Sequence, residues 1–561
     1  MAWPTPLWWR ESDAVTMRRQ VAPALAARME ESTEADGRGP TLAEVLEYQA
    51  ARRANHSAVV CGEQVHTFRS LNHAANRVAN ALSASGVLPG HRVAFWGRSC
   101  LEAIELVFGA AKAGVVPVMV NWRLGPREGG FILADSRSRL VVVDTDVAVA
   151  IGTDLQSMPD GITVLQTGSG ETYEVWRDGA SDRAPAPRST RVRDEALQLY
   201  TSGTTGHPKG VLLTAANCQS SIAAHCEALR MGDDAVQLIA LPLFHIGGLV
   251  LALASVGAGS TTLLVADADP FRLLTAIRQH GVTHLPTVPT MLADLLDAAE
   301  REGARLPTLR TICYGSAPMP ESVLRRAISM LDADLMTGYG MTETTATVTF
   351  LDFDDHRQAE RHDAPEHVRR RLHSVGRTGP SAAIKIVDPT TLQECPRGVH
   401  GEVLVRGPQV MKGYWNRNAD NDATLLPGGW IRTGDGGFLD RDGYLFLTDR
   451  IKDMIISGGE NVYPAELENV VADMAGIAEV AVIGVPDDRW GETPKVMAVR
   501  RAGADLTTAD VLAHCRAGLA HYKCPSTVEW LDELPRTASG KVLKHVLRER
   551  DRTAETDHGR I

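Results

Sequence analysis

The chain has 561 residues, which is too long for one hydrophobic core, so several subdomains are expected. Apolar residues make up 44%, which is typical of a soluble globular protein, and 58 Lys and Arg against 69 Asp and Glu give a net charge of −11, which disfavours a nucleic-acid partner. The eight cysteines form no C-x-x-C pair and indicate reduced thiols; with no transmembrane or signal-peptide pattern, they predict a cytoplasmic protein.

Helical and strand-like patterns alternate from Thr41 to the strand that ends at Val143. Apolar residues recur at helical spacing from Leu71 to Leu82. The elements predicted after them are a strand at 92–96, a helix at 99–113, and strands at 115–120 and 140–143. This rhythm is typical of a doubly wound parallel sheet.

The same alternation restarts after a polar connection at residues 169–195. The second series consists of strands at 236–241, 261–265 and 284–288 and helices at 247–258 and 270–280. A second doubly wound sheet is therefore predicted. Residues 351–373 are charged and nearly free of large apolar groups, which predicts a solvated insertion.

The pattern then changes to short strands separated by glycine turns, at 383–387, 401–406, 436–439 and 444–448. These strands predict a small antiparallel β-barrel. From Asp449 onward the composition is that of a compact α/β module, large enough to be a domain of its own. The predicted fold is thus α/β, with an N-terminal domain at 1–449 containing two doubly wound sheets and the barrel, and a small C-terminal domain at 450–561.

Residues 200–211, YTSGTTGHPKGV, contain three glycines and a lysine among hydroxyl side chains. Glycines allow backbone N–H groups to turn inward, and a concave run of N–H groups ringed by hydroxyls holds anionic oxygens. Lys209 would add a mobile positive charge. A phosphate-binding loop is predicted, formed by Thr201, Ser202, Gly203, Thr204, Thr205, Gly206 and Lys209.

This loop differs from a Walker loop, in which Gly-Lys is followed by Ser or Thr and leads into a helix. Here Lys209 is followed by Gly210, and both flanks read as strands. The chain is therefore predicted to run strand, loop, strand, so a helix dipole is not the main anion trap. The alternative is a mobile Gly/Ser/Thr-rich hairpin turn.

A carboxylate next to a hydroxyl occurs at Thr342-Glu343, and this pair suits Mg²⁺ and phosphate. Glu343 is predicted to reach the metal, usually through water, and Thr342 to reach a phosphate oxygen, while Tyr339 offers a flat face for a base. The stretch involved is Tyr339, Gly340, Met341, Thr342 and Glu343. The alternative is a turn with a solvent-facing glutamate.

Two further turns contain residues that suit a nucleoside. Small residues after Tyr314 would let a purine slide against the backbone; they are Gly315, Ser316, Ala317 and Pro318. By itself this is an ordinary loop after a strand. Asp435, at the end of Trp430-Ile431-Arg432-Thr433-Gly434-Asp435, could accept both ribose hydroxyls, or could form an Asx-turn.

Four of these stretches resemble, in their order along the chain, signatures of the acyl-adenylate-forming superfamily: TSGTTGHPKG, YGSAP, YGMTE and WIRTGD. This superfamily includes acyl-CoA synthetases, firefly luciferase and nonribosomal-peptide adenylation domains. The family usually has Gly-Gly-Ala-Pro where this chain has Gly315-Ser316-Ala317-Pro318. Seven such stretches occur between residues 200 and 541, and residues 1–195 contribute little catalytic signal.

The resemblance implies roles that composition and spacing do not supply. Arg450 would be the second ribose contact, Lys452 the hinge of a mobile C-terminal domain, and Lys541 the bridge between the attacking carboxylate and the α-phosphate. Gly458, Gly459 and Trp490 would line the CoA tunnel. Each stretch also has an ordinary alternative: a charged linker, a solvated lysine, a simple Gly-Gly turn or a core tryptophan.

The same resemblance places His245 in the acyl channel near the reacting carbonyl; the alternative is a core histidine at a helix entry. Gly315, Ser316 and Gly338 are small, which would leave room for a long or bulky acyl group. No Asp stands where amino-acid-activating relatives hold the substrate ammonium, so an amino acid is disfavoured. Residues 351–373 followed by SVGR resemble actinobacterial fatty-acid ligases. The predicted substrate is therefore a fatty or other large hydrophobic carboxylic acid.

The predicted activity is an AMP-forming acyl-CoA synthetase that uses ATP, Mg²⁺ and CoA. Three alternatives remain: transfer to an acyl carrier protein, retention of only one half-reaction, and a nucleotide- or acyl-binding scaffold without turnover. A luciferase-type oxygenation has no positive support in the sequence. A symmetric homodimer is the default expectation for the oligomeric state.

Overall fold

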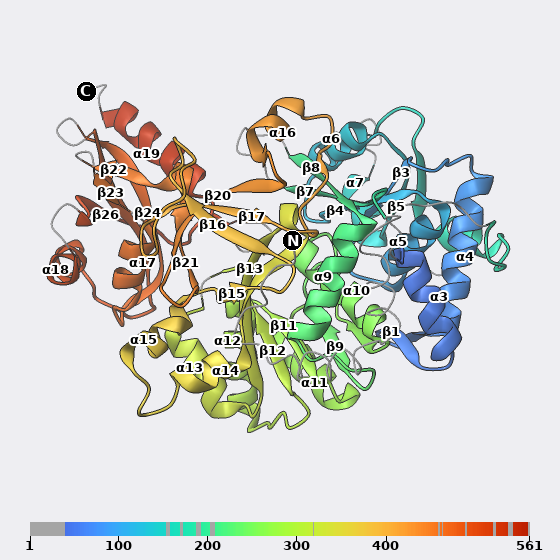
Figure 1. Ribbon diagram of the computed structural model, residues 1–561, viewed down its shortest axis with the longest axis horizontal. Coiled ribbons are helices and arrows are strands. Elements are labelled where there is room, and N and C mark those ends of the chain that lie inside the picture. Colours follow the sequence, from blue (N-terminus) through green and yellow to red (C-terminus); the bar gives the residue numbers. More distant parts are fainter. Residues whose placement is uncertain are drawn as a thin grey trace. The chain divides into compact units, whose positions relative to one another are not determined.

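The structure is a computed structural model that describes residues 40–152, 158–168, 172–186, 192–201, 208–317, 319–457, 460–462, 464–487, 491–519, 523–536 and 542–558 (Figure 1). Contacts between Cα atoms divide the chain into two compact units. The first unit contains residues 1–383 and 405–431, and the second contains residues 384–404 and 432–561. The domain boundary predicted from the sequence after residue 449 stays a prediction.

The larger sheet of the first unit has nine strands, and its centre is parallel, as the sequence predicted. Parallel pairing runs from β13 to β1, while β14, β15 and β2 pair in the antiparallel sense. The order across the sheet is β15 (Arg377–Thr378), β14 (Ala346–Leu351), β13 (Asp334–Met341), β12 (Thr311–Tyr314), β11 (His284–Thr287), β9 (Val236–Ile239), β10 (Thr261–Leu264), β1 (Ser57–Cys61) and β2 (Gln64–Thr67).

The second sheet of this unit has seven strands. Five of them are parallel, and the two at one edge, β8 and β18, are antiparallel. The order is β18 (Gly413–Tyr414), β8 (Lys209–Thr214), β7 (Glu195–Thr201), β4 (Val116–Val120), β3 (Arg92–Trp96), β5 (Ser138–Val143) and β6 (Thr163–Gln166). Strands β3 and β4 are buried along their whole length, which explains why they are apolar except for Arg92.

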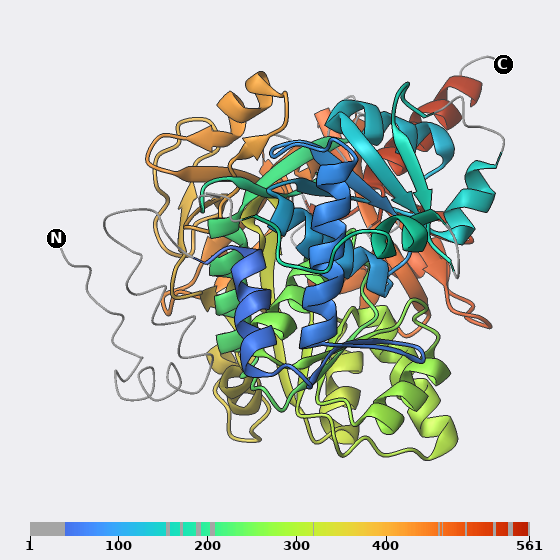
Figure 2. The same ribbon diagram turned by 90° about the vertical axis from the view of Figure 1, so that its right-hand side faces the viewer.

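Helices connect the parallel strands of both sheets, and Figure 2 shows the blue helices α3 and α4 side by side. Helix α5 is apolar on nearly all faces because it is buried on nearly all faces. The helices of this unit are α3 (Leu42–Arg52), α4 (Phe68–Ala84), α5 (Leu101–Ala113), α6 (Pro126–Ser136), α7 (Thr145–Ile151), α8 (Thr172–Asp178), α9 (Ala215–Ala228), α10 (Ile246–Ala258), α11 (Pro270–His280), α12 (Pro289–Glu302), α13 (Glu321–Met330), α14 (Phe353–Ala359), α15 (Glu366–Arg369) and α16 (Asn418–Thr424). Within the described ranges, no helix combines the length and the apolar composition needed to cross a bilayer.

The charged segment at 351–373 is not a fully solvated insertion, so that prediction is wrong for its first half. Helix α14 buries Phe353, Asp355 and His356, while α15 and the following 3₁₀ turn at 370–373 have no buried residues. His356 Nε2 lies 2.7 Å from the hydroxyl of buried Tyr314. Hydrogen bonds and ion pairs within the fold compensate the burial of these polar groups, which charge composition alone cannot reveal.

The strands predicted for a small barrel form a third sheet of five strands. Its order is β16 (Ala383–Val387), β17 (Gly401–Arg406), β20 (Trp430–Leu439) and β19 (Leu425–Leu426), with β21 (Leu445–Arg450) paired to β20. Pairing of β20 with β19 and with β21 is antiparallel. The strand between Gly436 and Leu439 begins six residues earlier than predicted, at Trp430.

The C-terminal α/β module contains a fourth sheet with apolar clusters on both faces. Alternate residues of β24 face opposite sides: Val482 belongs to one cluster, and Ala481 and Ile483 belong to the other. The strand order is β23 (Glu460–Val462), β22 (Ile455–Ser457), β25 (Gly491–Arg500) and β24 (Ile477–Asp487), with β26 (Thr527–Trp530) parallel to β25. The helices are α17 (Pro464–Ala472), α18 (Thr508–Gly518) and α19 (Lys544–His558).

Candidate functional site

The predicted phosphate loop is the connection of an antiparallel hairpin. Strands β7 and β8 pair in register, with Thr201 opposite Lys209 and Tyr200 opposite Gly210. The prediction of strand, loop, strand is therefore confirmed, and the helix that follows β8 begins only at Ala215. The loop residues Ser202, Gly203, Thr204, Thr205 and Gly206 lie outside the described residues, so their phosphate contacts stay a prediction.

Lys209 lies at the base of this loop and faces both an acidic and an aromatic side chain. Its Nζ atom is 2.5 Å from Asp420 Oδ1 and 5.4 Å from the centroid of the Tyr414 ring. Its side chain is 13% exposed, so the ammonium is largely shielded from bulk water. To bind a phosphate, Lys209 must exchange or share this carboxylate.

Glu343 is buried in the 3₁₀ turn η2 (Thr342–Thr344), so the alternative of a solvent-facing glutamate is wrong. The hydroxyl of Tyr414 donates a hydrogen bond of 2.8 Å to Glu343 Oε1. Thr342 begins the turn and is half-buried. Among the residues that the structure describes, no three His, Cys, Asp or Glu side chains are grouped to hold a metal. One carboxylate fits a magnesium ion that takes its other ligands from phosphate and water.

The turn after Glu343 is strained and is held by side-chain hydrogen bonds. Thr345 and Ala346 have φ angles of +49° and +76°, a region that residues with a Cβ rarely adopt. Ser221 Oγ donates to the carbonyl of Thr345, and Thr345 Oγ1 donates to the carbonyl of Gln409 over 2.7 Å. These bonds come from distant parts of the chain, so the surrounding fold fixes the backbone that carries Glu343.

The glycines at 338 and 340 are needed by the pairing of β13 with β14. A Cβ at Gly340 would lie 1.7 Å from the carbonyl oxygen of Ala346, and one at Gly338 would lie 2.2 Å from that of Thr349. This close approach explains glycine at 338 without any acyl group. Acyl binding at Gly338 stays a prediction.

Replacing Gly340 by alanine is expected to lower the free energy of unfolding by about 1–3 kcal/mol, because the new methyl group would overlap backbone atoms. Thermal unfolding measures the change. Gly247→Ala in α10 is the matched control, since a Cβ there meets no atom within 4 Å and alanine favours the helix. Equal melting temperatures for the two variants would contradict the close approach of the strands.

The loop after β12 contains the departure from the family pattern. Gly315 is bordered by open space, because a Cβ at this position would meet no atom within 4 Å. Ser316 has a φ of +67°. This backbone conformation costs glycine nothing, which explains the usual glycine of the family at this place. Ser316 and Ala317 are exposed, Tyr314 before them is buried, and Pro318 lies outside the described residues.

Ser316→Gly is expected to keep or raise the melting temperature, because relief of left-handed strain of about 1–2 kcal/mol offsets the larger chain entropy of glycine. The neighbouring Ala317→Gly variant has no such strain to relieve and should lose about 0.5–1 kcal/mol. Denaturant unfolding of both variants compares them directly. A larger loss at residue 316 than at residue 317 would show that the serine side chain stabilises the loop.

The two predicted ribose contacts are cross-strand neighbours. Asp435 on β20 pairs in register with Arg450 on β21. The backbone before Asp435 is held by the buried Glu402, which accepts the N–H of Gly434 over 3.2 Å and pairs with Arg432. Asp435 thus lies within a strand, at a place where the pairing of β20 with β21 shifts its register. The side chain of Arg450 is outside the description.

Three predicted loops of the C-terminal module have described flanks. Strand pairing of Ser457 with Glu460 closes the turn of Gly458 and Gly459, and Ser457 also pairs with Gly491, the residue after Trp490. An isolated antiparallel bridge between Arg536 and Val542 closes the loop that carries Lys541. Gly458, Gly459, Trp490 and Lys541 themselves lie outside the described residues. The pairing of Ser457 with Gly491 brings the flanks of the two stretches predicted to bind CoA next to each other.

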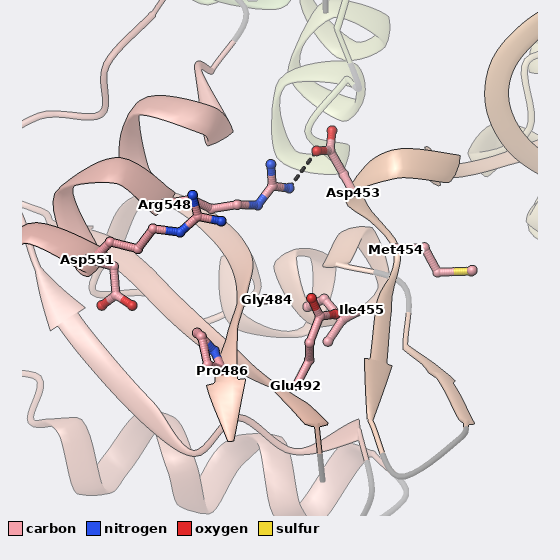
Figure 3. A pocket seen from close by; sticks show the side chains of 9 residues that line it. Asp453, Met454, Ile455, Gly484, Pro486, Glu492, Arg548 and Asp551 are labelled. Atoms are coloured by element: carbon pink, nitrogen blue, oxygen red, sulfur yellow. Dashed lines mark hydrogen bonds and ion pairs between the residues drawn. The ribbon is translucent and has the colours of Figure 1, made fainter. Parts of the chain in front are cut away.

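The predicted hinge residue Lys452 lies in the short 3₁₀ turn η4 (Ile451–Asp453) between β21 and β22. A polar cavity of about 90 Å³ lies beside this turn, and Arg548 of α19 reaches Asp453 there over 2.5 Å. Figure 3 shows the side chains that line the cavity. Helix α19 begins three residues after Lys541. An ion pair therefore joins the helix that follows the Lys541 loop to the predicted hinge turn.

His245 is the N-terminal cap residue of α10, and its ring is half-buried. Its ring centroid lies 5.1 Å from that of Phe244, and its carbonyl accepts the N–H of Leu249. A helix entry packed against an aromatic ring is compatible with both hypotheses stated for this histidine. Its role near an acyl group stays a prediction.

Sequence reasoning missed three residues. Tyr414 and Asp420 contact the predicted site residues Glu343 and Lys209, and Glu402 holds the backbone next to Asp435. Gly413-Tyr414-Trp415 is an unusual aromatic pair in a polar stretch, and this was the available signal. The pairing of Tyr414 with Val211 joins segments about 200 residues apart, and no local sequence pattern predicts this pairing. Asp420 and Glu402 carry no signal in the sequence beyond their charge.

Comparison with known proteins agrees with these features. Residues 46–415 match the AMP-binding enzyme family, and residues 466–541 match the AMP-binding enzyme C-terminal domain. Over 522 residues the chain is 36% identical to the fatty acid–[acyl-carrier-protein] ligase ScoC of Streptomyces coeruleorubidus, covering 91% of this chain and 96% of that protein. It is 37% identical to a feruloyl-CoA synthase of an Amycolatopsis species over 509 residues, covering 89% and 97%.

Among solved structures, the o-succinylbenzoate coenzyme A synthetase MenE of Bacillus subtilis, in complex with ATP and magnesium ion, superposes with a TM-score of 0.78. Its sequence is 32% identical, and the match covers 89% of this chain and 98% of that one. The family match spans most of the chain, and the relatives are aligned over nearly their whole length. The chain therefore belongs to the AMP-binding enzyme family of the acyl-adenylate-forming superfamily and is an AMP-forming acid–thiol ligase.

Proposed function

We propose that this protein is an acyl-CoA synthetase that converts a fatty or other bulky hydrophobic carboxylic acid into its CoA thioester. A carboxylate acylates poorly because its leaving group is oxide, so it first attacks the α-phosphate of ATP. Pyrophosphate leaves, and the acyl-adenylate then offers AMP as a good leaving group to the CoA thiolate. The observation that carries this proposal is the contact of Tyr414 with both Glu343 and Lys209, a carboxylate and a cation suited to one magnesium-bound triphosphate.

The adenylating step depends on charge screening and in-line placement more than on an acid or base. Mg²⁺ would be held by Glu343 and would screen the negative charge of the triphosphate. Lys209, Thr342 and the backbone of 201–206 would bind phosphate oxygens, and Lys541 would bridge the acid and the α-phosphate. The adenosine would be bound by Gly315, Ser316, Ala317, Pro318, Tyr339, Asp435 and Arg450.

The thioester step would use a different set of residues. In this proposal the chain reorients about Lys452, which removes Lys541 and brings in Gly458 and Gly459 to line the path of the pantetheine arm with Trp490. The strand pairing of Ser457 with Gly491 supports this proposal, because Ser457 precedes the Gly-Gly pair and Gly491 follows Trp490.

A large hydrophobic acid is supported by two observations. The space at Gly315 is open, and relatives of this chain are named for a fatty acid and for a feruloyl group. We propose that His245 lies near the carbonyl end of the acid. The acceptor could instead be a carrier protein, because the relative ScoC is named as a ligase for the acyl carrier protein.

The test is AMP formation with a panel of acids that contains acetate, saturated fatty acids of increasing length and hydroxycinnamic acids. The proposal expects a kcat/KM at least about 100-fold higher for one of the large acids than for acetate, because each buried methylene contributes about 0.8 kcal/mol. A preference for acetate would contradict it. Replacing CoA by a phosphopantetheinylated carrier protein in the same assay tests the acceptor: acyl transfer to the carrier without CoA turnover would favour the carrier alternative.

A further inference from the structure

We propose that Tyr414 is a positioning residue that orients the carboxylate of Glu343 for the magnesium ion of the nucleotide. The inference rests on the proposed function and adds to it a residue that acts through Glu343. Tyr414 would not contact the reacting atoms. Its hydroxyl would fix the direction of a ligand, as outer hydrogen-bond partners do at metal sites.

The backbone around Tyr414 is fixed to the strand that begins with Lys209. Tyr414 pairs in register with Val211, and the Trp415 N–H donates to the carbonyl of Gly210 over 2.7 Å. On its other side, Tyr414 exchanges two hydrogen bonds with the side chain of Asn421, of 2.6 and 3.0 Å. Hydrogen bonds with Gly210 and with Asn421 therefore hold the backbone of Tyr414 and Trp415 from two segments of the chain.

The same segment holds the turn that carries Glu343. The Met411 N–H donates to the Glu343 carbonyl over 2.8 Å, and the Tyr414 hydroxyl donates to Glu343 Oε1 over 2.8 Å. Tyr414 is 9% exposed and Glu343 is 6% exposed, so water does not replace these contacts easily. A phenol donates to an ionised carboxylate, and this bond fixes one oxygen and with it the plane of the group.

The face of the Tyr414 ring serves a second group of the same site. Lys209 Nζ lies 5.4 Å from the ring centroid, within the range of a cation–π contact, and it pairs with Asp420 of α16. One aromatic side chain thus touches the predicted metal ligand with its hydroxyl and the predicted phosphate-binding cation with its ring. The substitution Tyr414→Phe separates these roles, because it removes only the hydroxyl.

The experiment compares the Mg²⁺ dependence of pyrophosphate release in the unsubstituted protein and in the Tyr414→Phe variant. We expect the half-saturating Mg²⁺ concentration to rise by about 10-fold or more. Thioester formation from a supplied acyl-adenylate should be unchanged, because it involves no triphosphate. An unchanged Mg²⁺ midpoint in a folded Tyr414→Phe variant would overturn the proposal, whatever the change in melting temperature.

Tyr173→Phe is the matched control. Tyr173 is fully buried and donates to the buried carboxylate of Glu105 over 2.9 Å, so the same hydroxyl is lost beside the same kind of group. This variant should lose stability and keep its Mg²⁺ midpoint. A rise in the midpoint as large as that of Tyr414→Phe would mean that general destabilisation causes the effect, and would also overturn the proposal.

Two further measurements keep the test decisive. The double variant Glu343→Gln with Tyr414→Phe should be no worse than Glu343→Gln alone, because Tyr414 acts through Glu343; additive losses would contradict this. Mg²⁺-dependent binding of ATP, measured by calorimetry, needs no acid. If no acid yields pyrophosphate, the proposed function fails, while a weakened Mg²⁺ dependence of ATP binding in Tyr414→Phe would still support the positioning role, and an unchanged one would overturn it.

Discussion

Replacing Lys541 by alanine is expected to slow pyrophosphate release by about 100- to 1,000-fold, the usual loss when one group that stabilises transition-state charge is removed. The lysine would bind both the attacking carboxylate and the α-phosphate, and its charge is needed only while the adenylate forms. Thioester formation from a supplied acyl-adenylate should therefore stay within about threefold of the unsubstituted protein. Separate assays of the two half-reactions measure the contrast.

Lys544→Ala is the matched control for this prediction. Lys544 lies three residues after Lys541, in the first turn of α19, and its Nζ is 2.9 Å from Glu468 Oε1. The Lys544→Ala variant loses the same charge from the same segment, and its two half-reactions should keep nearly full rates. If Lys541→Ala slowed both half-reactions equally, the lysine would support the fold of the module and would have no specific role in the adenylating step.

Replacing Glu343 by glutamine is expected to reduce pyrophosphate release by at least about 100-fold at low Mg²⁺ and less at saturating Mg²⁺. Glutamine keeps the shape of the side chain and can still accept the Tyr414 hydroxyl, so the turn should remain folded. The neutral oxygen is a weaker ligand for a hard divalent cation than a carboxylate oxygen. The rate measured over a Mg²⁺ titration shows whether the loss is one of metal binding.

Glu105→Gln tests whether any buried carboxylate gives this result. Glu105 is 1% exposed, accepts a tyrosine hydroxyl as Glu343 does, and pairs with Arg177. The Glu105→Gln substitution should lower the melting temperature without changing the Mg²⁺ dependence of the rate. If Glu343→Gln left the titration unchanged, the assignment of this carboxylate to magnesium would be wrong.

The sequence predicts the parallel core of both large sheets well, because short apolar strands alternate with amphipathic helices. Strand β3 and helix α11 have the boundaries that the pattern indicated. The pattern did not assign the strand at 57–61, which precedes the strands of the seven-stranded sheet in the sequence. It pairs with β10 of the nine-stranded sheet, with Val59 opposite Thr262. Periodicity identifies a strand, but partner choice depends on long-range packing.

The candidate site shows the same division. Motifs predict a phosphate site at the loop before Lys209, a metal site at the turn of Glu343 and a ribose site at Asp435, because each of these ligands favours particular residue types near each other in sequence. The groups that hold these residues come from elsewhere in the chain: Tyr414 for Glu343, and Glu402 for the backbone before Asp435. Such partners are ordinary residues until the fold brings them into contact.

The strained turn at Thr345 and Ala346 shows a third limit. Both residues disfavour a positive φ, so local preference predicts a different backbone there. The conformation persists because hydrogen bonds from Ser221 and to Gln409 hold it. Sequence reasoning fails at this point because tertiary contacts override local preference at the segment that carries the predicted metal ligand.

The most direct measurement is pyrophosphate and AMP release with a panel of acids, in the presence and absence of CoA. The account predicts pyrophosphate without CoA, through the acyl-adenylate, and AMP together with an acyl-CoA thioester when CoA is added. Failure to release pyrophosphate with any acid, combined with thioester formation from a supplied acyl-adenylate, would contradict it. The assignment of Lys541 and the 201–210 loop to an adenylating site would then be wrong.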